Sequence, residues 1–194
     1  METYLLSAQR RQFDDRKLLE LIASGDHQAF REIYDKYYKR IYLYSYRQLG
    51  DGEGAQEVAN EVMLAVWKGA KRFRGESKPS TWMFGIAVNK IRKAIKKRPL
   101  PHKDLETVEK EADDTITQYD ATYSSELREK MRMAINSLSR EHREVLDMTY
   151  YQGLSIKEIA EITNCPLNTV KTRMFYARKR LGGILQHMGI GGEA

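Results

Sequence analysis

SLSREHREVLDMTYYQGLSIKEIAEITNCPLNTVKTRMFYARKRL, residues 137–181, decides the fold of the second half of this 194-residue chain. Its periodicity predicts one helix, a short second helix opened by Ser155, a turn at 164–166 and a final basic helix. Ser155 and Glu158 have the spacing of a capping box, in which each side chain satisfies a backbone donor of the other residue. Pro166 suits the first turn of the last helix, because its missing N–H would have no partner there. This order is that of a helix-turn-helix, which places its second helix in the major groove of DNA.

The final helix of this stretch has one apolar side and one polar, cationic side. Val170, Met174 and Leu181 are the expected buried positions, and Ala177 allows close packing. Arg and Lys pair bidentately with guanine, Asn and Thr address adenine or phosphate, and an aromatic ring contacts a thymine methyl group. The outward side chains that we expect to meet duplex DNA are Asn168, Thr169, Lys171, Thr172, Arg173, Phe175, Tyr176 and Arg178.

The rest of the chain predicts more helices. Apolar side chains recur at helical spacing in residues 15–24, 27–49, 54–71 and 81–98, and again from Ser124 onward. The many tyrosines of the second segment are expected to pack a core rather than to stack on bases. The alternation typical of strands is found nowhere, so we expect an all-α fold.

Charge divides the chain into blocks of opposite sign. The net charge is +6, but residues 66–98 hold eleven Lys and Arg against one acid, a net of +10. Residues 99–126 hold eight acids against two Lys, a net of −6, with little apolar content. We therefore predict two small helical domains, an N-terminal helical bundle at 15–98 and a helix-turn-helix domain at 124–187, joined by a flexible acidic linker at 99–123.

The basic end of the first domain is a second candidate nucleic-acid site. Cations alternate with aromatic rings from Arg72 through Trp82 and on to Asn89. A cationic surface with exposed rings suits single-stranded nucleic acid, because every base has a face that can stack. Trp82 alone is more often a core residue than a stacking platform, and a basic run is usually a solvated face. The polar loop beside both features favours the nucleic-acid interpretation.

Cofactor chemistry has little support in the sequence. The single cysteine, Cys165, excludes an internal disulfide, and the four histidines lack the spacing of a metal site. We therefore expect no metal and no cofactor. No signal peptide or bilayer-spanning stretch is found, which predicts a soluble, cytoplasmic protein without membrane insertion. An enzyme is disfavoured, since no carboxylate cluster or nucleophile–base pair stands out.

Several short motifs follow one another in a fixed order along both halves. The main ones are Ala55-Gln56-Glu57-Val58, Phe73-Arg74-Gly75, Thr81-Trp82, Gly153-Leu154-Ser155, Glu158-Ile159-Ala160 and Thr169-Val170-Lys171-Thr172-Arg173. In this order and spacing, over nearly the whole chain, the sequence resembles bacterial RNA polymerase sigma factors of the extracytoplasmic-function group of the sigma-70 superfamily. Departures from the family pattern include Glu57 for Asp, Asn60 for Gln, Met63 for Phe, and Lys93 where an acid is common.

The resemblance implies a transcription initiation factor with three contact surfaces. Its partners would be promoter DNA and core RNA polymerase, through the clamp coiled coil of the largest subunit and the flap of the second-largest subunit. An anti-sigma factor or another protein regulator is a further implied partner. The implied polymerase-binding residues are Glu57, Asn60, Glu61, Leu64 and Trp67. The implied −10 residues are Arg74, Lys78, Ser80, Trp82, Asn89, Lys90, Lys93, Lys96 and Lys97, and the final helix would read the −35 element.

A second, less favoured hypothesis is also compatible with the helix-turn-helix. The chain could be a stand-alone transcriptional regulator whose first 100 residues form a dimerisation or effector domain. Such a regulator binds duplex DNA tightly by itself and has no affinity for core polymerase.

Overall fold

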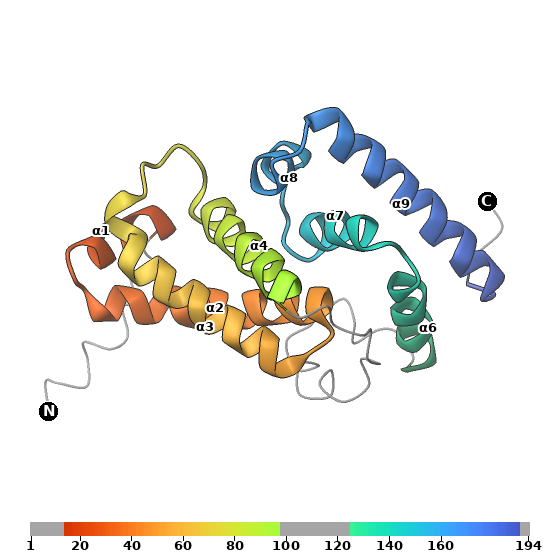
Figure 1. Ribbon diagram of the computed structural model, residues 1–194, viewed down its shortest axis with the longest axis horizontal. Helices are drawn as coiled ribbons and strands as arrows, with labels where there is room; N and C mark the ends of the chain where they lie inside the picture. Colours follow the sequence, from red (N-terminus) through yellow and green to blue (C-terminus); the bar gives the residue numbers. More distant parts are fainter. Residues whose placement is uncertain (1–13, 98–124, 191–194) are drawn as a thin grey trace, which may run out of the picture.

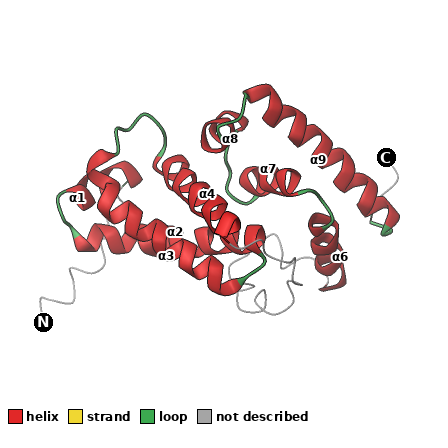
Figure 2. Ribbon diagram, viewed as in Figure 1, coloured by secondary structure: helices red, strands yellow, loops and turns green. Residues whose placement is uncertain are grey.

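The computed structural model describes residues 14–97 and 125–190, and every regular element within these ranges is helical (Figure 2). The predicted linker at 99–123 lies outside the described residues. The N-terminal bundle contains α1 (Asp15–Ala23), α2 (His27–Leu49), α3 (Gly52–Gly69), the 3₁₀ turn η1 (Ala70–Arg72) and α4 (Pro79–Lys97). The C-terminal bundle contains α6 (Ser125–Asn136), α7 (Arg140–Tyr150), α8 (Ile156–Thr163) and α9 (Leu167–His187). The all-α prediction is confirmed.

Capping residues explain where the long helices begin and end. The Asp26 carboxylate accepts hydrogen bonds from the backbone N–H of Gln28 and Ala29, at 2.7 and 3.0 Å, and so starts α2 at the predicted residue. Gly50 ends α2 with φ of 67°, a left-handed conformation that glycine adopts without a steric penalty. Both boundaries of α2 match the prediction.

Two helices begin earlier than the hydrophobic pattern predicts. Asp51 caps α3 by accepting from the N–H of Gly54 at 3.1 Å, so α3 begins at Gly52 rather than at 54. Helix α4 begins at Pro79 rather than Thr81, because proline is favourable at a first helical position. In contrast, Pro166 precedes α9 as its N-cap residue instead of lying in its first turn. The residues at these helix starts are polar residues, glycine or proline, so hydrophobic periodicity alone misplaces the starts of the helices.

The N-terminal core lies where α2, α3 and α4 cross. Tyr37, Ile41, Val62, Phe84 and Ile91 are all buried there. Tyr44 is buried as well, with its ring 5.7 Å from that of Phe84 in an edge-to-face arrangement. A second row of rings on α2, at Phe30, Tyr34, Tyr38 and Tyr42, is only partly buried against this core. The prediction that tyrosines pack the core holds for the first row.

The C-terminal core joins α7, α8 and α9. Val145 and Met148 of α7, Ile159 of α8, and Val170 and Met174 of α9 are buried. Ala177 is also fully buried, so the expected buried side of the last helix is confirmed apart from Leu181, which is partly buried.

The two bundles pack directly against each other: α4 lies beside α8, as Figure 1 shows, and α2 contacts α7. The sequence predicts two tethered modules and contains no signal for this contact. Polar and charged side chains take part in the contact, and hydrophobic periodicity does not register them. In the described residues, no helix is long and apolar enough to cross a membrane.

Candidate nucleic-acid interface

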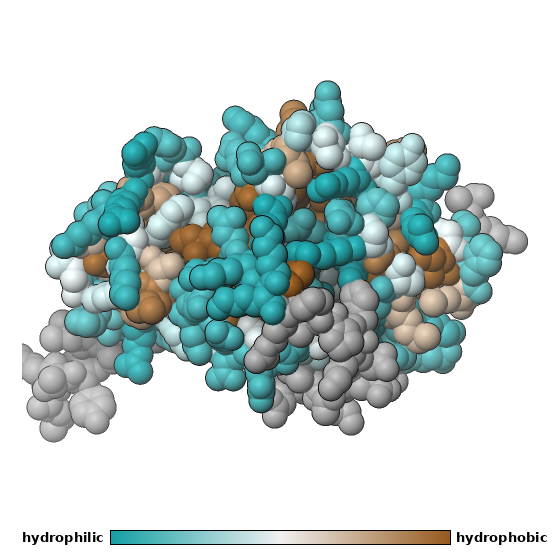
Figure 3. Space-filling model, in the orientation of Figure 1, coloured by the Kyte–Doolittle hydropathy of each residue, from teal (hydrophilic) through white to brown (hydrophobic). Residues whose placement is uncertain are grey.

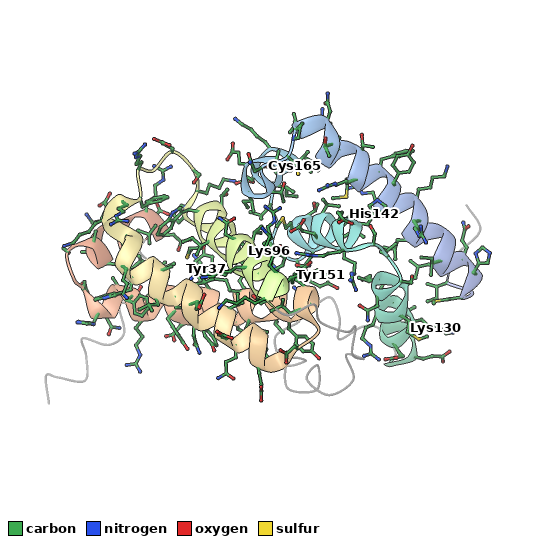
Figure 4. All side chains as sticks on the ribbon, viewed as in Figure 1. Tyr37, Lys96, Lys130, His142, Tyr151 and Cys165 are labelled. Carbon is green, nitrogen blue, oxygen red and sulfur yellow. The ribbon has the colours of Figure 1, made fainter. Side chains whose placement is uncertain are left out.

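The turn between α8 and α9 sets the direction of α9. The Ser155 hydroxyl accepts from the N–H of Glu158 at 3.3 Å, and the Glu158 carboxylate accepts from the N–H of Ser155 at 2.8 Å, so the predicted capping box is present. Asn164 ends α8 in the left-handed region, with φ of 53°. Cys165 lies in this turn between α8 and α9 (Figure 4). This short turn fixes the angle at which α9 leaves α8.

The polar side of α9 is turned to solvent. Phe175 and Tyr176 are 62% and 53% exposed, and their rings meet edge to face at 5.3 Å. Exposed apolar groups that adjoin one another, as these two rings do, can form part of an interaction surface. The other exposed residues of the predicted set are Asn168, Lys171, Thr172 and Arg178.

Two predicted −35 residues are less exposed to solvent than the others. Thr169 and Arg173 are half-buried at the edge of the stripe formed by Val170, Met174 and Ala177. The Arg173 guanidinium donates a long hydrogen bond to the Cys165 sulfur at 3.6 Å. Conversely, Lys179 and Arg180 are exposed on α9, and sequence reasoning did not include them. Both lie C-terminal to the motif Thr169-Val170-Lys171-Thr172-Arg173 on which the prediction was based, which explains the omission.

A second cationic surface lies along α4. Asn89, Lys93, Lys96 and Lys97 are exposed, and Lys96 projects from the end of α4 in Figure 4. Trp82 is half-buried, with its ring 5.2 Å from that of Phe73. Asn89 lies seven residues further along the helix, about 10 Å at a rise of 1.5 Å per residue. The tryptophan and the asparagine therefore lie along one face but two turns apart.

The loop before α4 and the first turn of α4 carry three more of the predicted −10 residues. Arg74 and Lys78 are exposed there, and Ser80 is half-buried at the start of α4. Arg16 of α1 holds the loop by donating a hydrogen bond to the carbonyl of Gly75 at 2.9 Å. Gly75 has φ of 71°, a conformation that glycine adopts readily. The loop is thus supported by the bundle at its tip.

The five predicted polymerase-binding residues share one side of α3. Glu57 and Asn60 are exposed, Glu61 is half-exposed, and Leu64 is 51% exposed. Trp67 lies beneath this surface, stacked on His27 with ring centroids 4.8 Å apart. In Figure 3 the visible face is mostly hydrophilic with separate apolar patches. Met63, one of the departures from the family pattern, is buried and does not reach the surface.

An ion pair joins the α3 face to the basic face of α4. Lys90 Nζ lies 2.7 Å from Glu61 Oε2. The hydrogen bond from Lys90 is the main cause that lowers the pKa of Glu61, and the charges of Lys93 and Lys97 add to it. One predicted polymerase residue and one predicted DNA residue are therefore paired in the free chain.

Glu158 is the most strongly perturbed acid of the C-terminal bundle, and sequence reasoning assigned it only the cap. Burial acts to raise the pKa of Glu158, but hydrogen bonds from Ser155, Lys78 and Thr81 outweigh burial and lower the pKa to about 2. Lys78 and Thr81 belong to the other bundle, so no local motif could have revealed this role.

We expect Glu158→Gln to lower the free energy of unfolding by about 2 kcal/mol at pH 7, because glutamine keeps the capping box but not the charge. A carboxyl group with a lowered folded-state pKa stabilises the fold above its ordinary pKa of 4.5. That stability is lost as the pH falls from about 5 toward 2. Denaturant unfolding of both proteins at pH 7, 5 and 3 measures the difference. If the difference in free energy of unfolding between the two proteins were the same at pH 7, 5 and 3, the stabilising role of the Glu158 charge would be contradicted.

The comparisons with known families agree with this layout. Residues 33–99 match the family described as Sigma-70 region 2, and residues 128–181 match Sigma-70, region 4. The first match contains α3, the loop and α4, and the second contains the helix-turn-helix.

Relatives match over almost their whole length. The chain is 33% identical over 175 residues to the ECF RNA polymerase sigma factor SigW of Bacillus subtilis, covering 86% of this chain and 94% of SigW. It is 28% identical to the RNA polymerase sigma-H factor of Pseudomonas aeruginosa, covering 90% of this chain and 95% of that protein. It is 29% identical to the ECF RNA polymerase sigma-E factor of Escherichia coli, covering 90% of this chain and 96% of that protein.

Solved structures share the fold. CnrH, in complex with the cytosolic domain of CnrY, matches with a TM-score of 0.64 and 21% identity, over 89% of this chain and 97% of that one. The sigma factor RpoE of Bartonella quintana, in complex with the anti-sigma factor NepR, matches with a TM-score of 0.63 and 21% identity, over 81% of this chain and 96% of that one. With both sigma-70 regions in order and full-length relatives at this identity, the chain belongs to the extracytoplasmic-function group of RNA polymerase sigma factors.

Proposed function

We propose that this chain is a promoter-specificity subunit, which binds core RNA polymerase and directs initiation through the −10 and −35 elements. The observation that carries the proposal is the presence, in one chain, of an outward reading helix α9, a cationic α4 and an exposed apolar site on α3. The role needs no catalytic group or cofactor, since the polymerase performs the chemistry. It places the protein in the cytoplasm with the polymerase.

Each part of the chain receives one task in this proposal. Residues 15–98 act as region 2, residues 124–187 act as region 4, and the acidic residues 99–123 tether them. The net negative charge of the tether suits the positively charged cleft of the polymerase through which the chain would pass.

The polymerase contact is assigned to the α3 face. Leu64 supplies an exposed apolar anchor, and Glu57, Asn60 and Glu61 surround it with polar groups. Interfaces commonly have this anatomy, with a desolvated apolar centre and a polar rim. Trp67 supports the anchor from below through its contacts with His27 and Phe30.

The −10 contact is assigned to the loop and to α4. Extruding a base from a duplex costs a few kcal/mol, so a site that holds the extruded base favours strand opening and discriminates sequence. Trp82 and Asn89 lie on the same face, and the lysines beyond them continue that face toward the phosphate backbone. We assign base contacts to Trp82 and Asn89, and phosphate contacts to Lys93, Lys96 and Lys97.

The −35 contact is assigned to α9, where Phe175 gives the sharpest test. Phe175→Ala should weaken the preference for a single base pair of the −35 element about tenfold or more, since a good base contact contributes about 1–3 kcal/mol. The fold should be unchanged because the ring is exposed. Binding to a set of singly substituted −35 duplexes measures this, with Met133→Ala of α6 as the control. Equal losses on every duplex would assign Phe175 to general affinity instead.

A further groove lies between α7 and the C-terminal half of α9. It is lined by His142, Tyr176, Arg180, Ile184, His187 and Met188. We assign the flap of the second-largest subunit to this groove, because the groove lies mostly beyond the reading residues of α9. An anti-sigma factor would inhibit the protein by covering either polymerase contact.

Reconstituted transcription tests the proposed function. Core polymerase with this chain should form open complexes on promoters of the source genome, and core alone should not. A demonstrated complex with core that opens no promoter would refute the proposal. A stand-alone regulator would instead bind duplex DNA tightly and would not be retained on immobilised core polymerase.

A further inference from the structure

The tip of the loop before α4 is tied to α1 by an arginine. The loop comprises residues 73–78, between η1 and α4. Arg16 Nη2 of α1 donates to the carbonyl oxygen of Gly75 at 2.9 Å, although the two residues are 59 positions apart in sequence. Among the hydrogen bonds and ion pairs of residues 14–97 and 125–190, this is the one that joins residues 74–77 to another element. Without it, the loop tip would depend on the two ends of the loop for its position.

The Arg16 guanidinium also lies against the side of Gly75 where a side chain would be. A Cβ atom at residue 75 would stand 3.2 Å from Arg16 Nη1 and 3.9 Å from Cζ. The first distance is shorter than an ordinary van der Waals contact, so the guanidinium occupies space that a side chain would need. Gly75 also has φ of 71°, which glycine adopts without a steric penalty. The close approach and the backbone conformation therefore both favour glycine at the point where Arg16 binds.

Arg16 can hold the loop because α1 is itself fixed to the bundle. Three apolar side chains on one side of α1 are buried, namely Leu18, Leu19 and Ile22. Asp15, the neighbour of Arg16, accepts a hydrogen bond from the Tyr37 hydroxyl of α2 and lies 2.7 Å from Lys36 Nζ. Burial and the hydrogen bond to Asp15 raise the pKa of Tyr37, so its hydroxyl remains a donor at neutral pH. The first turn of α1 is thus held on α2 while the Arg16 side chain reaches the loop.

The base of the loop is supported by the same helix. Helix α1 packs against η1, which directly precedes the loop (Figure 1). The Phe73 N–H donates to the carbonyl of Ala70 at 3.1 Å, which fixes Phe73 relative to η1. The Phe73 ring packs against Trp82, with ring centroids 5.2 Å apart. Helix α1 therefore supports the tip of the loop directly and, through η1, the tryptophan that we assign to the −10 contact.

We propose that Arg16 is a positioning residue for −10 recognition, which acts through the Gly75 carbonyl to fix the loop that meets the −10 strand. The inference rests on the proposed function. Arg74 and Lys78, on either side of Gly75 in the loop, belong to the predicted −10 set and are exposed. The direction in which their side chains leave the loop depends on the backbone at residue 75. A pocket for an extruded base discriminates sequence only when its groups are held in place.

The effect of Arg16 is expected on the loop rather than on the stability of the whole fold. One exposed hydrogen bond is a small share of the many interactions that stabilise a helical bundle. For a loop tip with few other anchors, the same bond is a large share of the difference between the ordered and the open loop. Loss of the bond should raise the open population of the loop about fivefold. Thermal unfolding of the whole chain should change little.

Proteolysis of the free, full-length chain tests the contact itself. Glutamyl endopeptidase cuts after Glu76, whose side chain is 77% exposed at the loop tip. Arg16→Ala should speed cleavage of the bond between Glu76 and Ser77 about fivefold, because the protease needs an open loop. Lys17→Ala is the matched control, since it removes the same charge from the next exposed residue of α1 and should leave the rate unchanged. Mass spectrometry follows this bond, and equal rates in the wild type and Arg16→Ala would overturn the proposal.

The base preference of the holoenzyme tests the positioning role. Open-complex formation is compared on promoters that carry single substitutions across the −10 element. Arg16→Ala should reduce the preference at a −10 position about fivefold, with the −35 preference and the salt dependence of binding unchanged. Lys17→Ala should match the wild type in all three measurements. A smaller salt slope with an unchanged base preference would make Arg16 a direct phosphate contact and would overturn the positioning role.

Gly75→Ala shows whether Arg16 acts through this contact. The new methyl group would press on the Arg16 guanidinium, and the positive φ would be strained. Because both changes disrupt the same contact, the double variant should lose only as much −10 preference as the more damaging single variant. A double variant whose loss equals the product of the two single losses would mean that Arg16 acts elsewhere.

Core polymerase distinguishes this inference from the proposed function. If Arg16→Ala speeds cleavage at Glu76 but the wild type opens no promoter with core, the loop contact stands and the proposed function fails. If the wild-type holoenzyme opens promoters with a −10 preference that Arg16→Ala leaves unchanged, the function stands and the positioning role fails.

Discussion

Replacing Leu64 with glutamate should weaken binding to core polymerase on the order of 100-fold and leave the fold intact. Leu64 is 51% exposed on α3, so its loss costs the isolated bundle little packing. Leucine and glutamate also have similar helix propensities. In a complex, however, the side chain would sit at the desolvated centre of the interface, where a new carboxylate is not hydrated. Titration of fluorescently labelled core polymerase measures the affinity.

The matched control for this change is Met133→Glu. Met133 is 53% exposed on α6, and it has the same apolar character and a similar helical setting, but lies outside the α3 face. It should bind core as the wild type does. An equal loss in both variants would mean that the effect is one of general charge. An undiminished affinity of Leu64→Glu would move the polymerase contact away from α3.

Local chemistry made much of the fold predictable. Helix α2 begins and ends where the sequence places it, because Asp26 and Gly50 act on the backbone within a few residues of themselves. The capping box at Ser155 was predictable for the same reason. Buried positions such as Val170 and Met174 follow from helical period alone. Features that depend on neighbours along the chain can thus be predicted from the residues themselves.

Features set by distant residues were not predictable. Nothing local distinguishes Arg173, which is half-buried beside Cys165, from the exposed Lys171 two residues earlier, because both are cations on the same helix. The second role of Glu158 depends on Lys78, which is 80 residues away in sequence. Such polar pairs contribute to the packing of one bundle on the other. Helical periodicity carries no information about which residue a cation will pair with.

The pairing of Lys90 with Glu61 connects two surfaces that the sequence treats separately. In the free chain this pair neutralises one charge on the proposed polymerase-binding face and one on the proposed DNA-binding face. A polymerase group that takes over Glu61 would release Lys90 for DNA, so the two binding events would favour one another. The exposed position of this pair limits the coupling to a modest size.

The final prediction concerns the lysines at the end of α4. Replacing Lys93, Lys96 and Lys97 together with glutamine should weaken promoter binding by the holoenzyme about a hundredfold at 0.1 M salt, evenly across sequences. All three side chains are exposed, so the fold should be unaffected. Each phosphate contact releases condensed counterions, and losing three contacts should reduce the slope of log affinity against log salt by about 2–3.

The control removes the same charge elsewhere, by replacing Lys17, Lys39 and Lys130 with glutamine. These residues lie on α1, α2 and α6, outside α4 itself. Because the net charge falls equally, long-range attraction changes equally in both variants, but only the α4 variant loses local contacts. Its salt slope should fall while that of the control should not. A loss confined to particular −10 sequences would instead assign these lysines to base recognition, and equal slopes in both variants would mean that α4 does not lie along the phosphates.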